Sequence, residues 1–207
     1  MAFLSPQKVI ERANLKSKPK IICGMDEAGR GPWAGPVVAA ALSFRKKDLR
    51  IVGLKNSKAL SAEKREQFYK ILTSKTDFAV GSATHEEIDN LGLIKATNLA
   101  FSRALESLMK KITPDLLIID GRDKFNLQVP YISVIKGDEK IKIIACASII
   151  AKVERDKIMK QYAKKFPFYG FDKNMGYGTK RHQQGLKEHG ICKIHRKSYK
   201  PVARLIK

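Results

Sequence analysis

The amino-acid sequence predicts an α/β fold, in which helices pack against a central β-sheet. Short apolar runs recur along the chain and are bounded by Gly, Pro or Asp; most are too short for buried helices, so they favour strands. Longer segments between them carry apolar residues at helical spacing, which favours helices that lie on the sheet. The chain has 207 residues, 43% of them hydrophobic, and is long enough for one well-buried core.

Each expected element has a local signal. Strands are expected at residues 21–23, 37–44, 78–83, 116–119 and 130–135. Helices are expected at residues 7–15, from Ser61 through 72, after Thr84, at 93–112 and at 141–165. Ser61 is placed to cap its helix, and Thr84 with Glu87 has the spacing of a capping box.

Two adjacent acids, Asp26 and Glu27, follow the first apolar run and precede a glycine-rich stretch. Neighbouring carboxylates repel each other unless a proton or a cation lies between them. Successive strand residues point to opposite faces, so both acids reach one ion only if the backbone bends, which Gly29 and Gly31 permit. The alternative is a tight turn with solvated acids. A dinucleotide-binding loop is rejected, because a strand-like run and not a helix follows the glycines.

Two further acids end or begin expected elements. Asp120 closes the strand at 116–119, and Asp138 stands at the entrance to the helix at 141–165. Asp115 opens the same strand as Asp120 and lies roughly 16 Å from it, so it cannot share its site. Asp156 lies about 27 Å along the helix and is expected to pair with Lys152, four residues earlier.

The residues Asp26, Glu27, Asp120 and Asp138 are therefore the candidate catalytic and metal-binding residues. The crevice at strand ends is the usual binding site of an α/β sheet. Ligation by oxygen alone favours Mg²⁺ or Mn²⁺ over zinc. Two such ions about 3.5–4 Å apart can activate water and hold a phosphodiester, so the constellation predicts phosphoryl transfer to water.

The charge balance indicates a polyanionic partner. The chain carries 41 Lys and Arg against 20 Asp and Glu, a formal net charge of +21. Nucleic acid is the expected partner, and an anionic membrane surface is the weaker alternative. No run approaches the roughly 20 apolar residues of a membrane helix. Three widely spaced cysteines suit a reducing compartment, so we expect a cytoplasmic protein.

The sequence changes character after Pro167, where aromatic residues alternate with Lys and Arg. Such interleaving suits stacking on bases or sugars beside phosphates, or the filling of a small helical core. His189, Cys192 and His195 are zinc-ligand types at regular spacing, but no fourth ligand accompanies them, so we interpret them as residues of a basic tail.

Several motifs resemble those of ribonuclease HII. They are Asp26-Glu27-Ala28-Gly29-Arg30-Gly31-Pro32, Asp120-Gly121, Lys136-Gly137-Asp138, Ala147-Ser148-Ile149-x-Ala151-Lys152-Val153-x-Arg155-Asp156, Tyr169-Gly170-Phe171, Gly176-Tyr177-Gly178-Thr179-x-x-His182 and His195-Arg196-x-Ser198. The resemblance extends from Lys20 to Pro201 and is very specific. The related type HIII enzymes normally carry an additional N-terminal domain, and we do not expect one in the short segment before Lys20.

This resemblance implies a ribonuclease H-like mixed β-sheet flanked by helices. Residues 1–165 would form the catalytic domain, and residues 166–207 a C-terminal helical, basic and aromatic substrate-binding region packed on it. The implied activity is metal-dependent hydrolysis of the RNA strand of RNA–DNA hybrids, and cutting 5′ to ribonucleotides embedded in duplex DNA. We expect 3′-hydroxyl and 5′-phosphate ends, two Mg²⁺ or Mn²⁺ ions in the substrate complex, and a monomer.

The resemblance also assigns substrate contacts. Gly29, Arg30 and Gly31 would sense the ribose 2′-hydroxyl, and Tyr177 would stack at the junction sugar. The other implied substrate-binding residues are Ser57, Lys58, Ser148 and Arg196. The chain departs from the family pattern at Asn56 and Ala59, where the family usually has Asp and Lys, and at Met175, where a lysine is common.

Two other functions are compatible with parts of this pattern. A non-catalytic basic nucleic-acid-binding protein would explain the charge, but gives no reason for acids beside glycines at several strand or helix ends. A junction-resolving nuclease of the same fold would share the acids and cut branched DNA. Cleavage of a duplex with one ribonucleotide separates these alternatives.

Overall fold

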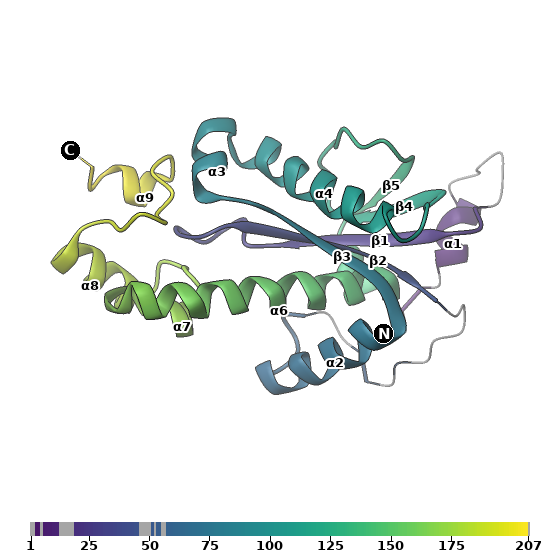
Figure 1. Ribbon diagram of the computed structural model, residues 1–207, viewed down its shortest axis with the longest axis horizontal. Helices are drawn as coiled ribbons and strands as arrows, with labels where there is room; N and C mark the ends of the chain where they lie inside the picture. Colours follow the sequence, from purple (N-terminus) through teal and green to yellow (C-terminus); the bar gives the residue numbers. More distant parts are fainter. Residues whose placement is uncertain are drawn as a thin grey trace.

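A mixed five-stranded sheet with strand order β3-β2-β1-β4-β5 forms the centre of the molecule (Figure 1). The computed structural model describes residues 3–4, 6–12, 19–45, 51, 53–54 and 57–206. The strands are β1 (Ile22–Ala28), β2 (Val37–Phe44), β3 (Thr76–Ala83), β4 (Leu116–Asp120) and β5 (Tyr131–Val134). β1 pairs antiparallel with β2 and β2 with β3, whereas the pairs β1–β4 and β4–β5 are parallel. The predicted α/β fold with a mixed sheet is confirmed.

Helices cover both faces of this sheet. They are α1 (Pro6–Arg12), α2 (Ala62–Lys75), α3 (His85–Leu91), α4 (Leu93–Met109), α5 (Gly137–Lys140), α6 (Lys142–Lys165), the 3₁₀ helix η1 (Pro167–Tyr169), α7 (Phe171–Asn174), α8 (Lys180–His189) and α9 (Lys200–Ala203). Figure 1 shows α4 on one face and the long α6 on the other, with α2 beyond α6. The sequence expectation for the first helix reached residue 15, and residues 13–15 lie outside the described part.

Each face of the sheet has its own apolar core. Alternate residues of β2 divide between the cores: Ala39 and Ala41 pack on the α4 side, whereas Ala40 and Leu42 pack on the α6 side. A Cβ on Gly24 of β1 would lie 2.6 Å from the backbone oxygen of Ile143, so this glycine lets α6 approach the sheet closely. The small residues at the start of α6 therefore serve helix–sheet packing.

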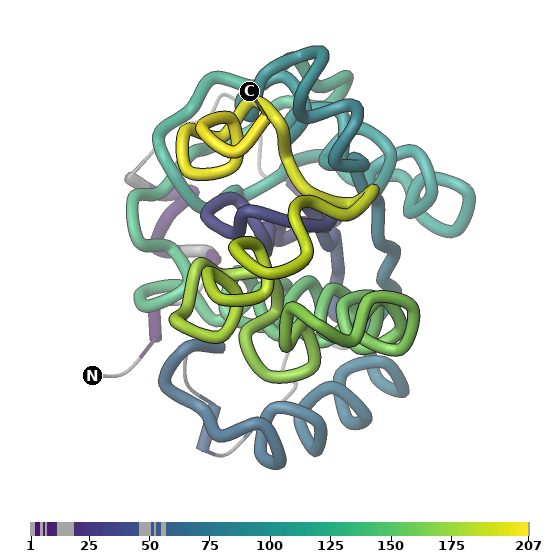
Figure 2. Tube along the Cα trace, turned by 90° about the vertical axis from the view of Figure 1, so that its left-hand side faces the viewer, coloured from purple at the N-terminus to yellow at the C-terminus, as the bar shows by residue number. Residues whose placement is uncertain are grey.

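The segment from residue 166 onward builds a third apolar core. The rings of Tyr169 and Phe171 stack with their centroids 5.2 Å apart. Both residues are buried together with Met159 of α6 and with Ala34 in the loop after β1. Ala34 forms a β-bridge with His195, and the Gly35 N–H donates to the Ile194 carbonyl (2.9 Å). Figure 2 shows this C-terminal segment, in yellow-green, crossing the purple loop that follows β1. The C-terminal region thus lies against the glycine-rich loop.

One detail of the first strand differs from expectation. The acids were expected at a bend after the strand, but β1 continues through Ala28, and Asp26 pairs in regular register with Ala40. The side chains of Asp26 and Glu27 therefore leave the strand on opposite faces. Pairing with β2 on one edge keeps the backbone extended, and the positive φ of the loop begins at Gly29 (105°).

Candidate active site

The four predicted acids come from the end of β1, the end of β4 and the start of α5. The parallel β1–β4 register ends at Met25 opposite Ile119, so Asp26 and Asp120 are the next residues on adjacent strands. Asp120 in turn pairs with Val134 of β5, after which Lys136 takes a left-handed conformation (φ 55°) and starts α5. Asp138 lies in the first turn of α5. Chain topology thus brings all four acids to one end of the sheet, with Asp26 and Glu27 on opposite faces of β1.

Asp26 is a buried carboxyl with like charges around it. It is 4% exposed, and burial raises its pKa well above the usual range, with further increases from Glu27 and Asp120. Hydrogen bonding with Ser148 lowers the pKa again, as does the Glu27 N–H, which donates to Asp26 Oδ1 at 2.7 Å. Asp26 therefore favours a proton or a bound cation at neutral pH.

The carboxylate of Glu27 has fewer hydrogen-bond partners than that of Asp26. Burial raises its pKa to about 7, the Arg30 guanidinium opposes this increase, and Asp120 adds to it. Arg30 Nη1 lies 3.5 Å from Glu27 Oε1. The other oxygen, Oε2, is buried and has no hydrogen-bond partner among the described residues. A buried carboxylate oxygen without a donor is the kind of atom that a cation would satisfy.

Asp120 links the two halves of the cluster. Its Oδ1 accepts a hydrogen bond from the Gly137 N–H at 2.6 Å, which ties α5 to the end of β4. Asp138 is 6% exposed; burial raises its pKa, Asp120 raises it further, and the Lys58 ammonium lowers it. Asp120 thus acts electrostatically on Asp26, Glu27 and Asp138 alike.

The chemistry of this cluster fits a hard divalent cation. All its side-chain donors are carboxylate oxygens, the ligands that Mg²⁺ and Mn²⁺ prefer, and their mutual repulsion is relieved by positive charge. The orphaned Oε2 of Glu27 supports the same fit. Within the described ranges, however, no three His, Cys, Asp or Glu side chains are already arranged to hold a metal ion. The carboxylates share one region without adopting a ligand geometry.

The predicted substrate loop lies beside this cluster. A Cβ on Gly31 would lie 3.3 Å from Cε1 of Tyr177, so the tyrosine ring, in a residue that is 49% exposed, stands over the loop. Arg30 extends from the loop to Asp123, whose Oδ2 accepts from Arg30 Nη1 at 2.7 Å. Gly29, Arg30, Gly31 and Tyr177 are therefore brought together at an accessible surface.

Three other predicted contacts lie behind the carboxylates. The hydroxyls of Ser57 and Ser148 are 2.7 Å apart, and both residues are buried, at 4% and 5% exposure. Ser148 hydrogen bonds with Asp26, so it supports the carboxylate cluster. Lys58 is exposed and acts on Asp138. Its neighbour Asn56, one of the departures from the family pattern, lies outside the described residues.

Arg196 lies beneath the loop and not at its surface. The resemblance implies a substrate contact, but its side chain is 0% exposed. Its guanidinium donates to the carbonyls of Gly29 (2.6 Å), Arg30 (3.0 Å) and Gly35 (2.9 Å), which leaves it beneath the loop. Arg196 thus holds the loop from below. Burial and three backbone acceptors occupy the guanidinium group, which a phosphate contact would need.

Two functional candidates were missed in the sequence. Asp123 partners Arg30, and Arg155 donates to the carbonyls of Ala34, Pro36 and Met175. Asp123 stands in an irregular loop, where no periodic pattern marks it. Arg155 belongs to one of the motifs that resemble ribonuclease HII, but only the structure shows that its side chain contacts the loop after β1.

The excluded residues have other partners. Asp115 accepts hydrogen bonds from the N–H groups of Lys20 and Ile21, both at 2.8 Å. Asp156 pairs with Lys152 at 2.6 Å, as predicted. His189 stacks on Phe168, and His195 hydrogen bonds with His182. 

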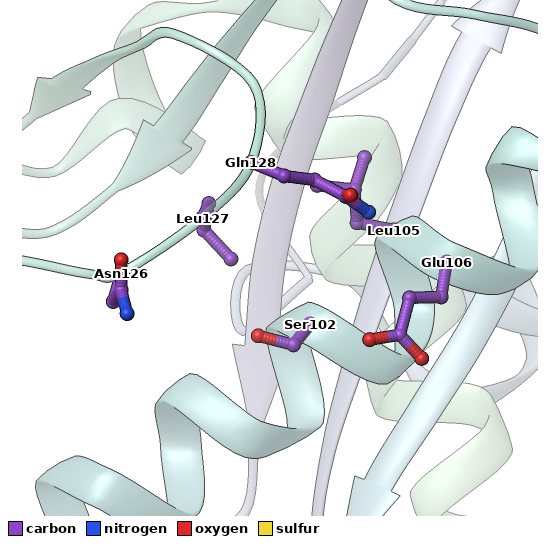
Figure 3. Close-up of a pocket in the computed structure, with 6 residues that line it drawn as sticks. All are labelled: Ser102, Leu105, Glu106, Asn126, Leu127 and Gln128. Atoms are coloured by element: carbon purple, nitrogen blue, oxygen red, sulfur yellow. The ribbon is translucent and has the colours of Figure 1, made fainter.

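A polar pocket opens between α4 and the loop before β5 (Figure 3). Its lining consists of Ser102, Leu105, Glu106, Asn126, Leu127 and Gln128. None of these is a predicted site residue, so the pocket is separate from the carboxylate cluster.

Sequence and structure comparisons relate this chain to known proteins. A sequence model described as Ribonuclease HII matches residues 23–202. The chain is 46% identical over 208 residues to the Ribonuclease HII of Magnetococcus marinus, covering 99% of this chain and 97% of that protein. The solved structure of ribonuclease H2 from Pyrococcus horikoshii OT3 superposes with a TM-score of 0.78 at 29% identity, covering 89% of this chain and 96% of that one.

A third comparison shows the fold alone. The structure of Bst-RNase HIII in complex with Mn²⁺ superposes with a TM-score of 0.71 at 18% identity, covering 90% of this chain and 69% of that one. The matched family model spans nearly the whole chain, including all four acids and the loop beneath Tyr177. The chain belongs to the ribonuclease HII family.

Proposed function

We propose that the protein is a metal-dependent endoribonuclease that hydrolyses the RNA strand of RNA–DNA hybrids and cuts 5′ to ribonucleotides embedded in duplex DNA. Membership of the ribonuclease HII family supports this activity. The observation that carries the proposal is the placement of Asp120 among Asp26, Glu27 and Asp138, beside the loop of residues 29–31. Four acids at one end of the sheet serve phosphodiester hydrolysis better than binding alone.

Asp26, Glu27, Asp120 and Asp138 would hold the metal, as Mg²⁺ or Mn²⁺. The oxygen-only donor set and the unpartnered Oε2 of Glu27 support this assignment. The Mn²⁺ in the structure of Bst-RNase HIII agrees with it. When bound, divalent ions supply Lewis-acid activation of water and stabilisation of the leaving oxygen. Water, and not the 2′-hydroxyl, is then the nucleophile, so we expect 3′-hydroxyl and 5′-phosphate ends.

The remaining groups bind and orient the duplex. The backbone of residues 29–31 would read the ribose, and the exposed Tyr177 ring would stack on the sugar at the junction, since it stands directly over Gly31. Lys58, beside Asp138, would contact the phosphate backbone. Met175 replaces a lysine that is common in the family, so this chain would make one phosphate contact fewer at that position.

The surface charge suits a duplex partner. A formal net charge of +21 surrounds a local cluster of acids, so the surface as a whole would attract phosphates, and bound metal ions would offset the repulsion at the acids. No helix in the part of the chain that the structure describes is long and apolar enough to cross a membrane. We propose a cytoplasmic monomer; the cysteines Cys23, Cys146 and Cys192 are free thiols, which suits a reducing compartment.

A cleavage assay tests the function. A DNA duplex with one ribonucleotide, an RNA–DNA hybrid and an all-DNA four-way junction are incubated with the protein in Mg²⁺, in Mn²⁺ and in chelator, and the ends are mapped. We expect cutting of the first two substrates, only with metal, on the 5′ side of the ribonucleotide. Cutting of the junction would favour the resolvase alternative. Binding with no cutting under any metal condition would favour the non-catalytic protein, and a cyclic phosphate would contradict the metal-activated water.

A further inference from the structure

Two arginines are buried beneath the substrate loop. Arg155 of α6 is 1% exposed and Arg196 is 0% exposed, and they head the largest fully buried side chains. Neither forms an ion pair within the described part of the chain. Burial of a charge without a carboxylate partner is costly, and it is tolerated only when hydrogen bonds satisfy the group. The arrangement of their acceptors therefore indicates what the two residues do.

Arg155 joins two separate segments. Its Nε donates to the Pro36 carbonyl at 2.9 Å and its Nη2 to the Ala34 carbonyl at 3.2 Å, both in the loop after β1. Its Nη1 donates to the Met175 carbonyl at 2.9 Å, two residues before Tyr177. One rigid, planar group thus fixes the spacing between the two loops.

Arg196 holds only the first of these loops. Its donors reach the carbonyls of Gly29, Arg30 and Gly35, and its Nη1 also donates to the hydroxyl of Tyr199 at 2.9 Å. The Tyr199 hydroxyl then donates to the Arg30 carbonyl at 2.5 Å. This network turns the carbonyls of the loop inward.

The glycines of the loop are matched to these side chains. A Cβ on Gly29 would lie 2.1 Å from Nε of Arg155, so any larger residue would displace the guanidinium. A Cβ on Gly31 would meet the Tyr177 ring on the opposite loop. The Trp33 N–H donates to the Gly176 carbonyl at 2.8 Å, which adds a backbone link between the same loops.

We propose that Arg155 and Arg196 are positioning residues that set where the backbone of residues 29–31 stands relative to Tyr177, and thereby how selectively the enzyme accepts a ribose. The inference rests on the proposed function for its meaning, but its geometry can be tested without activity. Arg155 couples the loop of residues 29–36 to the loop of residues 174–178. Arg196 and Tyr199 restrain only the first loop.

Amide hydrogen exchange followed by mass spectrometry tests this division. In Arg155→Lys the charge stays but the planar fork is lost, so exchange should accelerate in both loops. In Arg196→Lys and in the milder Tyr199→Phe it should accelerate in residues 29–36 and stay unchanged in residues 174–178. If Arg155→Lys does not fold, the Arg196→Lys and Tyr199→Phe results decide the proposal.

Arg103→Lys is the matched control. Arg103 also makes three hydrogen bonds, to Ser82 and to both carboxylate oxygens of Glu87, but on α4 at the surface. Its substitution should leave exchange in both loops as in the unmodified protein. Unchanged exchange in residues 29–36 for Arg196→Lys and Tyr199→Phe overturns the proposal, as does equal acceleration of both loops in those two variants.

An activity measurement connects the positions of the loops to selectivity. Cleavage at a ribonucleotide is compared with cleavage at a 2′-fluoro nucleotide in the same duplex. We expect Arg155→Lys to lower kcat at the ribonucleotide on the order of tenfold or more, as misplaced reacting groups do. The ratio between the two substrates should fall, while affinity for the duplex stays. A parallel loss of affinity and kcat, with the ratio unchanged, contradicts the selectivity role. Failure of the unmodified protein to cut refutes the proposed function and leaves the exchange result intact.

Discussion

At the scale of single residues, the carboxylate cluster has an electrostatic cost that a proton or a bound cation removes. Asp26, Glu27 and Asp138 all have raised pKa values, chiefly because they are buried, and repulsion from Asp120 adds to each. Such a cluster destabilises the folded protein when it is ionised and empty of positive charge. Selection for function and not for stability is the natural explanation of four acids at one end of the sheet.

Asp138→Asn tests the catalytic assignment. We expect cleavage of the single-ribonucleotide duplex to fall by at least about a hundredfold, the scale on which loss of one charge-stabilising group acts. Duplex affinity and the thermal midpoint should be retained, since the substitution removes a repelled charge. Asp115→Asn is the control: Asp115 caps two backbone N–H groups away from the site, and its substitution should leave kcat unchanged. Loss of folding in Asp138→Asn would mean that the acid is structural.

The pKa of Glu27 predicts a pH dependence of stability. Because the pKa rises from 4.5 in the unfolded chain to about 7 in the folded one, the folded state holds more protons between these values. Stability of the metal-free protein should therefore decline as pH rises from about 4.5 to 7, by at most about 1.4 kcal/mol per pH unit from this residue. Thermal unfolding in chelator across this range measures the decline.

Glu27→Gln provides the comparison for that measurement. The variant cannot ionise at position 27, so it should be more stable than the unmodified protein at pH 7.5 and gain little at pH 5. Mg²⁺ should raise the midpoint of the unmodified protein more at pH 7.5 than at pH 5, because the ion binds carboxylates. A midpoint of the metal-free protein that rises with pH over this window would contradict the assignment.

At the scale of elements, the sequence predicted much of the architecture because its signals are local. The capping box of Thr84 and Glu87 and the N-cap of Ser61 are present at the starts of α3 and α2. The ends of elements were less predictable: β3 begins at Thr76, directly after α2, where no turn residue separates helix from strand. Pairing with β2 over its full length extends the strand beyond its apolar run.

The residues of the site likewise include some that local sequence signals predict and others that only the structure shows. Acids beside glycines at strand ends and at a helix entrance marked Asp26, Glu27, Asp120 and Asp138, because this pattern recurs at three separate places in the sequence. Burial of Arg196 and the contacts of Arg155 depend on packing between β1 and the C-terminal segment, more than 100 residues away. No local pattern encodes such a distance, so the residues that support the loop could be found only from the structure.

Packing between α4 and β3 depends on one glycine. A Cβ on Gly81 would lie 2.3 Å from the Ala100 carbonyl oxygen and 2.4 Å from the Ala104 nitrogen, both backbone atoms of α4. Gly81→Ala should therefore push the helix off the sheet and destabilise the protein by about 3 kcal/mol. A loss of less than about 1 kcal/mol in chemical denaturation would mean that α4 yields to the extra atom.

At the scale of the whole molecule, an excess of positive charge surrounds a negative centre. The two serve different steps, since general duplex affinity depends on phosphate contacts and cutting depends on the acids. The C-terminal region supplies exposed cations next to Tyr177, among them Lys173 and Lys180. Affinity and catalysis should consequently respond to different substitutions.

Salt dependence of duplex binding tests this separation. If the C-terminal region contacts phosphates, Lys173→Gln combined with Lys180→Gln should reduce the slope of log K against log salt by about two, roughly one for each contact. Lys110→Gln is the matched control. This exposed lysine follows the 17-residue α4, so the length of that helix, about 25 Å, separates it from the helix start, which lies on the side of the C-terminal segment (Figure 1). The slope should not change in the control. An equal change in both proteins would mean that the duplex binds the positive surface without a preferred face. The C-terminal region would then not position the duplex relative to the four acids.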